Sequence, residues 1–282
     1  MDSSLNKENQ TNLKSQKKNN QNENEKQEDP LLAYINSNRE ISEEEIKSSP
    51  IVIMTEEGGK LLNGKEIKIN AAGMIGGRGA KDGVSIFGKN NDNNNDFIPD
   101  FELNYDEKLN YPYIFAIYFQ RETKNFFIRA YPSKGSDNRI LFVKLARNYE
   151  LPLKQKEIIT AGNVIFQITP VEENKIEIAN LSKKDSSNNL KQVFDPNENK
   201  EVTIGRDKNC NFAFPKDKSF SRHQTTFSYD DNSKEWTILD GMKDKGSTNG
   251  TWVFGTHSFQ IKDQLIVEIL SSKIKFSLVQ ND

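Results

Sequence analysis

The chain has little of the chemistry on which most metal sites and many catalytic sites depend. Its 282 residues include one cysteine, Cys210, and two histidines. An internal disulfide is therefore impossible, and a closed zinc site with four Cys or His ligands cannot be assembled. Lysine and arginine number 39 against 41 acidic residues, so no basic surplus favours general binding to nucleic acid or to an anionic membrane. We predict no metal, no cofactor, no nucleic-acid partner and no membrane partner.

Long apolar runs are also missing. The densest run, Tyr113–Phe119, is far too short to cross a bilayer as a helix. Residues 1–20 contain no apolar stretch of the signal-peptide type, so we do not expect export. These absences predict an intracellular protein of a reducing compartment. The cytoplasm is favoured, and cytoskeletal, ciliary and nuclear locations stay open.

Residues 1–48 form a polar, low-complexity tail that differs in kind from the rest. Between Met1 and Pro30 the only large apolar residues are Met1, Leu5 and Leu13. So little apolar area cannot offset about 1–2 kcal/mol of backbone entropy for each ordered residue. We expect this tail to be disordered unless a partner orders it. The apolar residues that follow predict either a strap on the first domain or a partner-binding motif: Leu31, Leu32, Tyr34, Ile35, Ile41 and Ile46.

From Ile51 onward the sequence predicts an all-β protein. Short apolar or alternating runs are separated by Gly, Asn, Asp and Pro at spacings typical of β-sandwiches. Only Ser42–Ser48 has a helical pattern, in which Ser42 and Glu45 form a capping box. The expected strands are 51–55, 66–69, 84–87, 114–120, 125–131, 140–145 and 164–169, and then 201–204, 212–214, 224–229, 235–239, 251–254, 258–261, 264–270 and 274–279.

These two series of strands indicate an internal repeat. The first copy opens with Ile75-Gly76-Gly77-Arg78 as the second opens with Thr203-Ile204-Gly205-Arg206. Its closing run, 164–168, likewise matches 273–278 in the second copy. A linker is expected around 180–189, where Ser, Lys, Asp and Asn cluster. We therefore predict two tandem sandwiches, over residues 49–180 and 183–282.

Three loops of the second copy hold its chemically informative residues. Gly205-Arg206 ends one strand, residues 219–223 (Ser-Phe-Ser-Arg-His) precede another, and residues 246–251 (Gly-Ser-Thr-Asn-Gly-Thr) join two more. Alternate loops of a sandwich gather at one end, so these three can converge. Guanidinium groups and hydroxyls suit an anion with tetrahedral oxygens. The set has no obvious general base and no carboxylate ligands, so we predict neither catalysis nor metal binding.

This order of motifs, G-R, then S-R, then G-S-T-N-G-T, resembles that of the forkhead-associated (FHA) domain family over about residues 190–280. The resemblance implies an eleven-stranded β-sandwich whose loops bind phosphothreonine peptides. By position, Arg206 and Ser221 would contact the phosphate, and Arg222 would be a further contact. Thr248 would line the same pocket, and Asn249 would hold the peptide backbone. Gly205, Gly246 and Gly250 would serve loop geometry.

One position departs from the family pattern. The family usually reads S-R-x-H, with the histidine bracing neighbouring loops, whereas this chain has Gln224 in that place and His223 one residue earlier. Glutamine has both a donor and an acceptor and could replace the brace. We assign His223 and Gln224 loop-structural roles, and we predict a non-enzymatic adaptor that binds a phosphothreonine-containing protein.

The first copy lacks the equivalent loops, because no Ser-Arg pair and no Asn-Gly-Thr follow Arg78 at the matching places. We interpret it as a divergent FHA-like domain that does not bind phosphate and offers a protein-binding surface instead. The alternative function for the whole chain is a structural component of a large cytoskeletal or ciliary assembly without phosphate recognition. An open hollow around Arg206 favours the adaptor, and an acidic side chain paired with Arg206 favours the scaffold.

Overall fold

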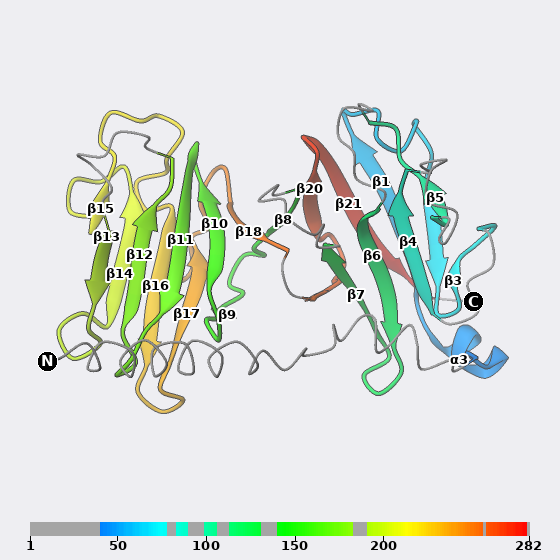
Figure 1. Ribbon diagram of the computed structural model, residues 1–282, viewed down its shortest axis with the longest axis horizontal. Coiled ribbons are helices and arrows are strands. Elements are labelled where there is room, and N and C mark those ends of the chain that lie inside the picture. The colour runs from blue at the N-terminus through cyan, green and yellow to red at the C-terminus, as the bar shows by residue number, and fades with distance from the viewer. Residues whose placement is uncertain are drawn as a thin grey trace, which may run out of the picture. The chain divides into compact units, whose positions relative to one another are not determined.

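A computed structural model of the protein describes residues 40–77, 83–89, 99–105, 113–130, 140–182, 191–255 and 258–280 (Figure 1). The predictions for residues 1–39, and for the apolar residues of 31–35, lie outside the described residues. The all-β prediction is confirmed, because α3 (Glu43–Ser48) is the one helix in the described part of the chain. No helix among the described residues is long and apolar enough to cross a membrane.

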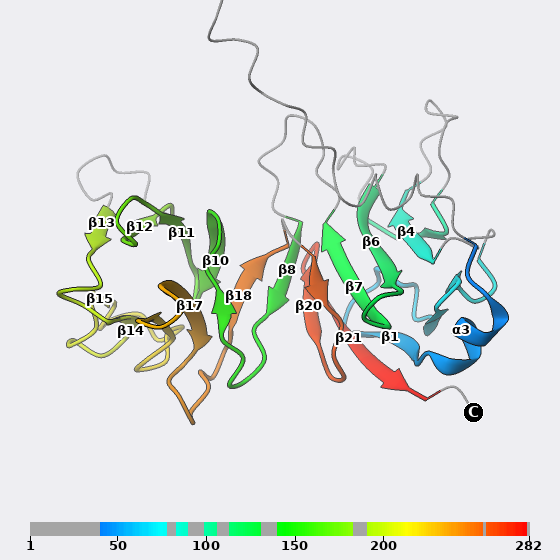
Figure 2. The ribbon, with the colours of Figure 1, turned by 90° about the horizontal axis from the view of Figure 1, so that it is seen from below.

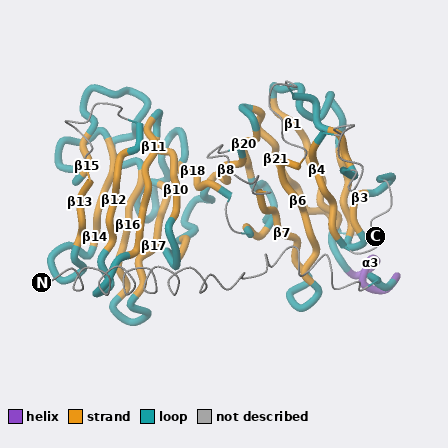
Figure 3. Tube along the Cα trace, viewed as in Figure 1, coloured by secondary structure: helices purple, strands orange, loops and turns teal. Residues whose placement is uncertain are grey.

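Two series of strands follow each other along the chain, and Figure 3 shows how much of the molecule they make up. The first repeat contains β1 (Ile51–Glu57), β2 (Ile67–Asn70), β3 (Gly73–Met74), β4 (Val84–Gly88), β5 (Phe101–Glu102), β6 (Tyr113–Gln120), β7 (Asn125–Ala130), β8 (Leu141–Lys144), β9 (Leu151–Pro152), β10 (Glu157–Ala161) and β11 (Val164–Pro170). The second repeat contains β12 (Ile176–Asn180), β13 (Lys191–Phe194), β14 (Glu201–Gly205), β15 (Phe212–Ala213), β16 (Thr225–Asp230), β17 (Glu235–Asp240), β18 (Thr251–Phe254), β19 (Phe259–Gln260), β20 (Ile266–Ile269) and β21 (Ser272–Val279).

The described strands form three sheets. An eleven-stranded sheet has the order β13-β12-β11-β10-β18-β8-β20-β21-β1-β2-β3. The two five-stranded sheets have the orders β15-β14-β16-β17-β9 and β19-β7-β6-β4-β5. The two five-stranded orders match strand for strand, which agrees with an internal repeat. Each five-stranded sheet and its half of the long sheet make one β-sandwich.

The two repeats exchange their last three strands. β10 of the first repeat pairs with β18 of the second, with Thr160 opposite Trp252, and β9 pairs with β17. In return, β21 pairs with β1 over seven residue pairs, and β19 pairs with β7. Figures 1 and 2 show the exchange by colour, since green β10 and β11 lie among yellow and orange strands while red β21 lies beside blue β1. The first sandwich is thus β1–β8 with β19–β21, and the second sandwich is β12–β18 with β9–β11.

The exchange is centred on the antiparallel pair β8 and β18, where Val143 lies opposite Val253. β8 is the last consecutive strand of the first repeat in the first sandwich, and β18 is the last consecutive strand of the second repeat in the second sandwich. After each of these strands the chain crosses to the other sandwich. The expected tandem arrangement of consecutive residues therefore differs from the observed strand pairing. The division into 49–180 and 183–282 stays a prediction about repeats of the sequence, and β12 already pairs with β13 beyond that boundary.

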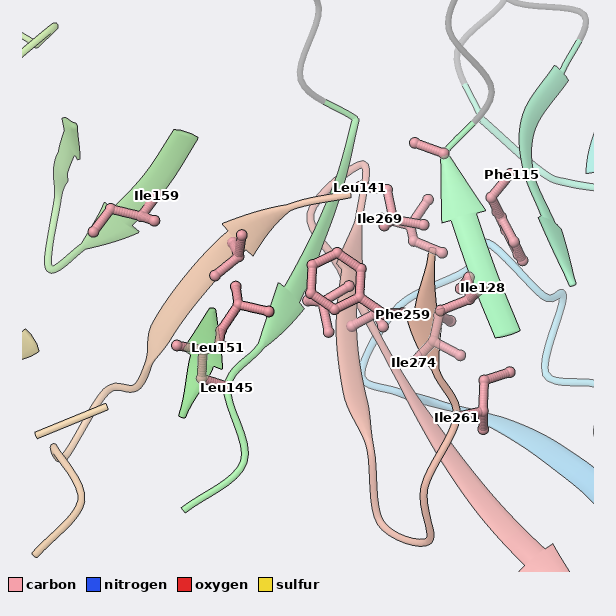
Figure 4. Packing of buried hydrophobic residues seen from close by; sticks show 14 of the residues in the cluster. Phe115, Ile128, Leu141, Leu145, Leu151, Ile159, Phe259, Ile261, Ile269 and Ile274 are labelled. Atoms are coloured by element: carbon pink, nitrogen blue, oxygen red, sulfur yellow. The ribbon is translucent and has the colours of Figure 1, made fainter. Parts of the chain in front are cut away.

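Buried apolar side chains join both sandwiches into one core cluster. Exchanged strands contribute to it directly, since the ring of Phe166 in β11 makes edge contacts with Phe212 and Phe214 at centroid distances of 6.0 and 5.9 Å. Figure 4 shows Phe259 of β19 among side chains of β7, β8 and β20, close to the crossing point. Exchange thereby buries apolar surface of each repeat against the other.

The segment before β1 lies on the first sandwich. The predicted capping box is present, because the Ser42 hydroxyl accepts from the Glu45 N–H at 3.3 Å and the Glu45 carboxylate accepts from the Ser42 N–H at 2.9 Å. Arg121, in the turn after β6, pairs with Glu45 through Nε and Oε1 at 2.9 Å. Ile41 is buried and Ile46 packs against the core. The described end of the tail is therefore held by both apolar and charged contacts.

Candidate functional site

Three turns of the second sandwich meet at one end of it. Arg206 follows β14, and its N–H donates to the Ser221 carbonyl at 2.8 Å. The Asp207 N–H donates to the Arg222 carbonyl at 3.0 Å, which joins the same two turns a second time. The third turn is attached through Thr248, whose N–H donates to Ser221 Oγ at 2.8 Å. Backbone geometry thus gathers the motifs that lie far apart in the sequence.

The turns surround an open hollow of about 580 Å³. All five residues predicted to bind the phosphopeptide line it, together with His223 and Gly246. Gly205, Gln224 and Gly250 are buried and do not line it. The complete lining is Arg206, Asp207, Lys218, Phe220, Ser221, Arg222, His223, Met242, Lys245, Gly246, Thr248 and Asn249.

The hollow carries an excess of positive charge. Two arginines and two lysines line it against one carboxylate, that of Asp207. Asp207 Oδ1 accepts from the Asn209 N–H at 3.0 Å. Among the described residues, neither the Arg206 nor the Arg222 guanidinium makes an ion pair or a hydrogen bond. Arg206 is half-buried and Arg222 is exposed, so both cations are open to an anion.

Gln224 occupies the brace position with three hydrogen bonds from a fully buried side chain. Its Oε1 accepts from the Ser221 N–H at 3.0 Å. Its Nε2 donates to the Gly250 carbonyl at 2.8 Å and to Ser247 Oγ at 2.7 Å. One amide therefore ties the Ser-Arg turn to the turn before β18, because it offers the donor and the acceptor that the two turns need.

Asp240 is a supporting residue that sequence reasoning missed. Its Oδ1 accepts from Ser247 Oγ at 2.7 Å and from Thr251 Oγ1 at 3.0 Å, and its Oδ2 accepts from the Ser247 N–H at 3.1 Å. A carboxylate that is only 5% exposed is satisfied in this way. The available signal was an aspartate that directly follows the apolar pair Ile238-Leu239 and directly precedes a glycine.

Asn249 is partly engaged within the protein. Its Nδ2 donates to the Ser219 carbonyl at 2.7 Å, which connects two of the converging turns. Its Oδ1 has no hydrogen-bond partner among the described residues. Asn249 therefore combines a structural contact with an unused acceptor, and the residue lines the hollow.

His223 lies beside the single cysteine. Its Nδ1 is 3.9 Å from Cys210 Sγ, and that thiol also contacts the Arg222 carbonyl at 3.4 Å. Burial raises the pKa of the Cys210 thiol, which disfavours the thiolate. The neutral thiol is therefore packed against the Ser-Arg turn.

Two glycines are required, Gly205 by close approach of backbone and Gly250 by its left-handed φ. A Cβ at Gly205 would lie 2.1 Å from the Arg222 carbonyl oxygen, so a side chain there would separate the two turns. Gly250 has a φ of +83°, and a Cβ there would lie 2.3 Å from Lys144 Cε. A side chain is less restricted at Gly246, where a Cβ would lie 3.3 Å from its nearest atom, Asp240 Oδ2.

The first sandwich has different residues at the corresponding places. The comparison of the two copies paired Arg78 with Arg206, but the strand equivalent to β14 is β4, because each pairs in parallel with the short strand that follows. Gly88 opposite Glu102 matches Gly205 opposite Ala213, so Lys89 takes the place of Arg206. That pairing of Arg78 is corrected, and Arg78 itself lies outside the described residues.

The brace is also absent from the corresponding place in the first sandwich. Phe87 lies opposite Phe115 as Ile204 lies opposite Thr225, so Ile114 corresponds to Gln224. Ile114 is buried and has no polar group with which to join two turns. Lys89 Nζ, for its part, lies 5.6 Å from the centre of the Tyr105 ring.

The second sandwich is thus a β-sandwich whose converging loops place cations and hydroxyls around one open hollow. Residues 202–268 match the model of the FHA domain. The FHA domain is a module for protein interaction that binds phosphorylated peptides and is not catalytic. No curated protein and no solved structure matches the chain.

The matched segment runs past the crossing point of the two repeats. It ends at residue 268, within β20. β20 belongs to the first sandwich, because it pairs with β8 and β21. In the second sandwich the corresponding place is taken by β10, which pairs with β18. The family pattern thus follows the repeat along the sequence, whereas the sandwich contains residues of both repeats.

Proposed function

We propose that the second sandwich binds phosphothreonine peptides and that the chain acts as a non-enzymatic adaptor for a phosphothreonine-containing protein. The observation that carries this proposal is the open hollow lined by Arg206, Arg222 and Ser221. Within the described part of the chain, neither guanidinium group has an ion-pair or hydrogen-bond partner. Such a surface suits a tetrahedral dianion, because a phosphorylated threonine carries about −1.5 to −2 charges at neutral pH. The FHA match over residues 202–268 supports the same conclusion.

Each of the three groups has a distinct role in this proposal. Ser221 Oγ already accepts from the Thr248 N–H, so its own hydrogen is available to donate to a phosphate oxygen. The planar guanidinium of Arg206 pairs with two phosphate oxygens, and that of Arg222 approaches from the solvent side. Three charge-assisted hydrogen bonds at about 1.5–3 kcal/mol each, less the costs of association, correspond to micromolar binding.

The peptide backbone beside the phosphothreonine is assigned to Asn249. Its Nδ2 is bonded to the Ser219 carbonyl, which fixes the amide plane, and its Oδ1 stays open. An extended peptide presents backbone N–H groups that such an acceptor can bind. Thr248, exposed on the rim next to it, lines the pocket for the threonine side chain.

The alternative of a scaffold without phosphate recognition has less support. It requires that the chain fill the hollow or that an acidic side chain neutralise Arg206. Within the described ranges the hollow is open and Arg206 has no ion pair. For the first sandwich we propose no phosphate binding, since Ile114 and Lys89 stand at the places of Gln224 and Arg206, and we assign it a protein-binding role.

Titration of a fluorescent phosphothreonine peptide library against Arg206→Ala tests the proposal. We expect the variant to lose at least about 100-fold in affinity, because about 3 kcal/mol of charge-assisted hydrogen bonding is removed. Its thermal melt should stay nearly unchanged, since the guanidinium has no partner within the described residues. The matched control is Lys208→Ala, an exposed cation two residues away that does not line the hollow. Equal affinity in the two variants would reject the assigned pocket.

A further inference from the structure

Residues of the first repeat contact the converging turns of the second repeat, which are the turns that we assign to phosphopeptide binding. The Asn163 N–H, in the turn between β10 and β11, donates to Ser219 Oγ at 3.2 Å. Arg147, which follows β8, donates from Nη2 to the Asp244 carbonyl at 2.8 Å. Lys144 in β8 lies against Gly250, and its Nζ is 5.7 Å from the centre of the Trp252 ring. Two of the three converging turns are therefore held from outside their own repeat.

The backbone of the first repeat also approaches these turns closely at Gly162. A Cβ at this residue would lie 2.6 Å from Ser219 Oγ and 2.9 Å from Cδ2 of the Phe220 ring. Ser219 and Phe220 directly precede Ser221, and the Ser219 carbonyl accepts from Asn249 Nδ2. The β10–β11 turn thus lies immediately behind the residues assigned to the phosphate and to the peptide backbone.

The second repeat has a turn at the same place in its own hairpin, but the residues of that turn differ from Gly162 and Asn163. In the first repeat two residues separate the facing pair Ala161 and Val164, and in the second Leu270 and Ser271 separate Ile269 and Ser272. Leu270 therefore corresponds to Gly162. A leucine at the place of Gly162 would bring its Cβ within 3 Å of Ser219 and Phe220. The second repeat's own hairpin cannot occupy that place unless the loops move.

We propose that the phosphopeptide site is composite: Gly162, Asn163 and Arg147 of the first repeat are positioning residues for the loops of the second. The exchanged strands deliver a glycine turn that allows the Ser219–Ser221 segment to approach, and the second repeat cannot provide this turn itself. The role of these residues in peptide binding rests on the proposed function. Their effect on the position of the loops can be measured without any peptide.

The test compares Gly162→Ala with Gly64→Ala in the full chain. Both glycines have a left-handed φ, +58° and +70°, but no atom lies within 4 Å of a Cβ at Gly64. The control therefore carries the backbone strain without the contact. In the absence of peptide, we expect amide hydrogen exchange of residues 217–223 and 246–250 to be at least about tenfold faster in Gly162→Ala than in Gly64→Ala. Equal exchange in the two variants would overturn the inference.

Peptide titration of the same variants separates this inference from the proposed function. We expect Gly162→Ala to bind a phosphothreonine peptide at least about tenfold more weakly than Gly64→Ala. If the loops loosen in Gly162→Ala but the unaltered chain binds no such peptide, the proposed function fails and the positioning holds. If the unaltered chain binds the peptide and Gly162→Ala binds it equally well, the composite site is refuted.

Two further measurements keep the inference testable if Gly162→Ala fails to fold. Arg147→Ala removes an exposed side chain, so folding should persist while residues 242–250 exchange faster than in Lys154→Ala, an exposed cation that does not contact these turns. A protease site inserted between Glu172 and Glu173, in the exposed turn between β11 and β12, allows the folded chain to be cut between the repeats. The halves should remain associated until denaturant is added, and their separation in native buffer would contradict the exchange.

Discussion

Gln224→Glu is the most informative single change in the site, because it alters the chemistry of the brace and keeps its shape. The introduced carboxylate can still accept from the Ser221 N–H. It cannot donate to the Gly250 carbonyl or to Ser247 Oγ, which Gln224 Nε2 contacts at 2.8 and 2.7 Å. The position is fully buried, and Ser247 also bonds the Asp240 carboxylate, so the introduced carboxylate places a second negative charge beside an existing one.

The magnitude follows from the two lost hydrogen bonds and the buried charge. The Gly250 carbonyl is left without a donor, whereas Ser247 Oγ still accepts from the Gly250 N–H at 2.8 Å. A buried acceptor left without a partner costs about 1–3 kcal/mol, and a buried charge costs more. We therefore expect Gln224→Glu to lower the free energy of unfolding by about 3–5 kcal/mol at pH 7. Gln192→Glu in β13, where the side chain is exposed, should change it by less than about 0.5 kcal/mol.

The pH dependence identifies the cause. Burial raises the pKa of the introduced carboxyl above its unfolded value of about 4.3, so the neutral form is favoured in the folded state. The penalty relative to the unaltered chain is then full above the folded pKa and fades as the pH falls toward about 4.3. Urea unfolding of both chains between pH 7 and pH 5, with peptide titration at each pH, measures this. A penalty that is below about 0.5 kcal/mol, or that does not change with pH, would refute the assigned role of Gln224.

Two further predictions concern residues outside the hollow. Hydrogen bonds from Ser42, together with the nearby Arg121, lower the pKa of Glu45, so its stabilisation is full above the ordinary carboxyl pKa of about 4.3 and is lost as the pH falls through the folded value. Glu45→Gln should therefore lower the thermal melt at pH 7, and this loss should shrink as the pH falls below about 4.3. An equal loss at every pH would contradict this. Because Cys210 is buried and burial raises the pKa of its thiol, alkylation of the folded chain at pH 8 should be slower than in denaturant, and comparable rates would show that the thiol is accessible.

Local features of the structure could be predicted from the sequence because they depend on neighbouring residues. The capping box of Ser42 and Glu45 is a local exchange of hydrogen bonds, and most strands follow from alternation and turn residues. Gln224 was predicted as a brace because an amide has both a donor and an acceptor. Asp240 was missed, since its role depends on burial beside Ser247 and Thr251, which only the folded chain brings together.

The strand exchange could not be predicted from patterns. β9–β11 and β19–β21 have similar alternation, so each set fits either sandwich, and hydrophobic periodicity does not choose between them. The difference between Gly162 and Leu270 becomes informative only when the approach of Ser219 is known. Arg78 was paired with Arg206 for a related reason, because Gly-Gly-Arg resembles Gly-Arg locally. The Gly-Gly-Arg segment follows the β2–β3 hairpin, whereas Gly205 is the last residue of the central strand β14.

The most direct test of phosphate recognition observes the phosphorus atom itself. The ³¹P NMR resonance of a phosphothreonine peptide selected from the library should shift when the unaltered chain is added, and it should not shift with Arg206→Ala at the same concentration. A resonance that stays in place while the peptide binds, or an equal shift with the variant, would show that the peptide is held by some other surface.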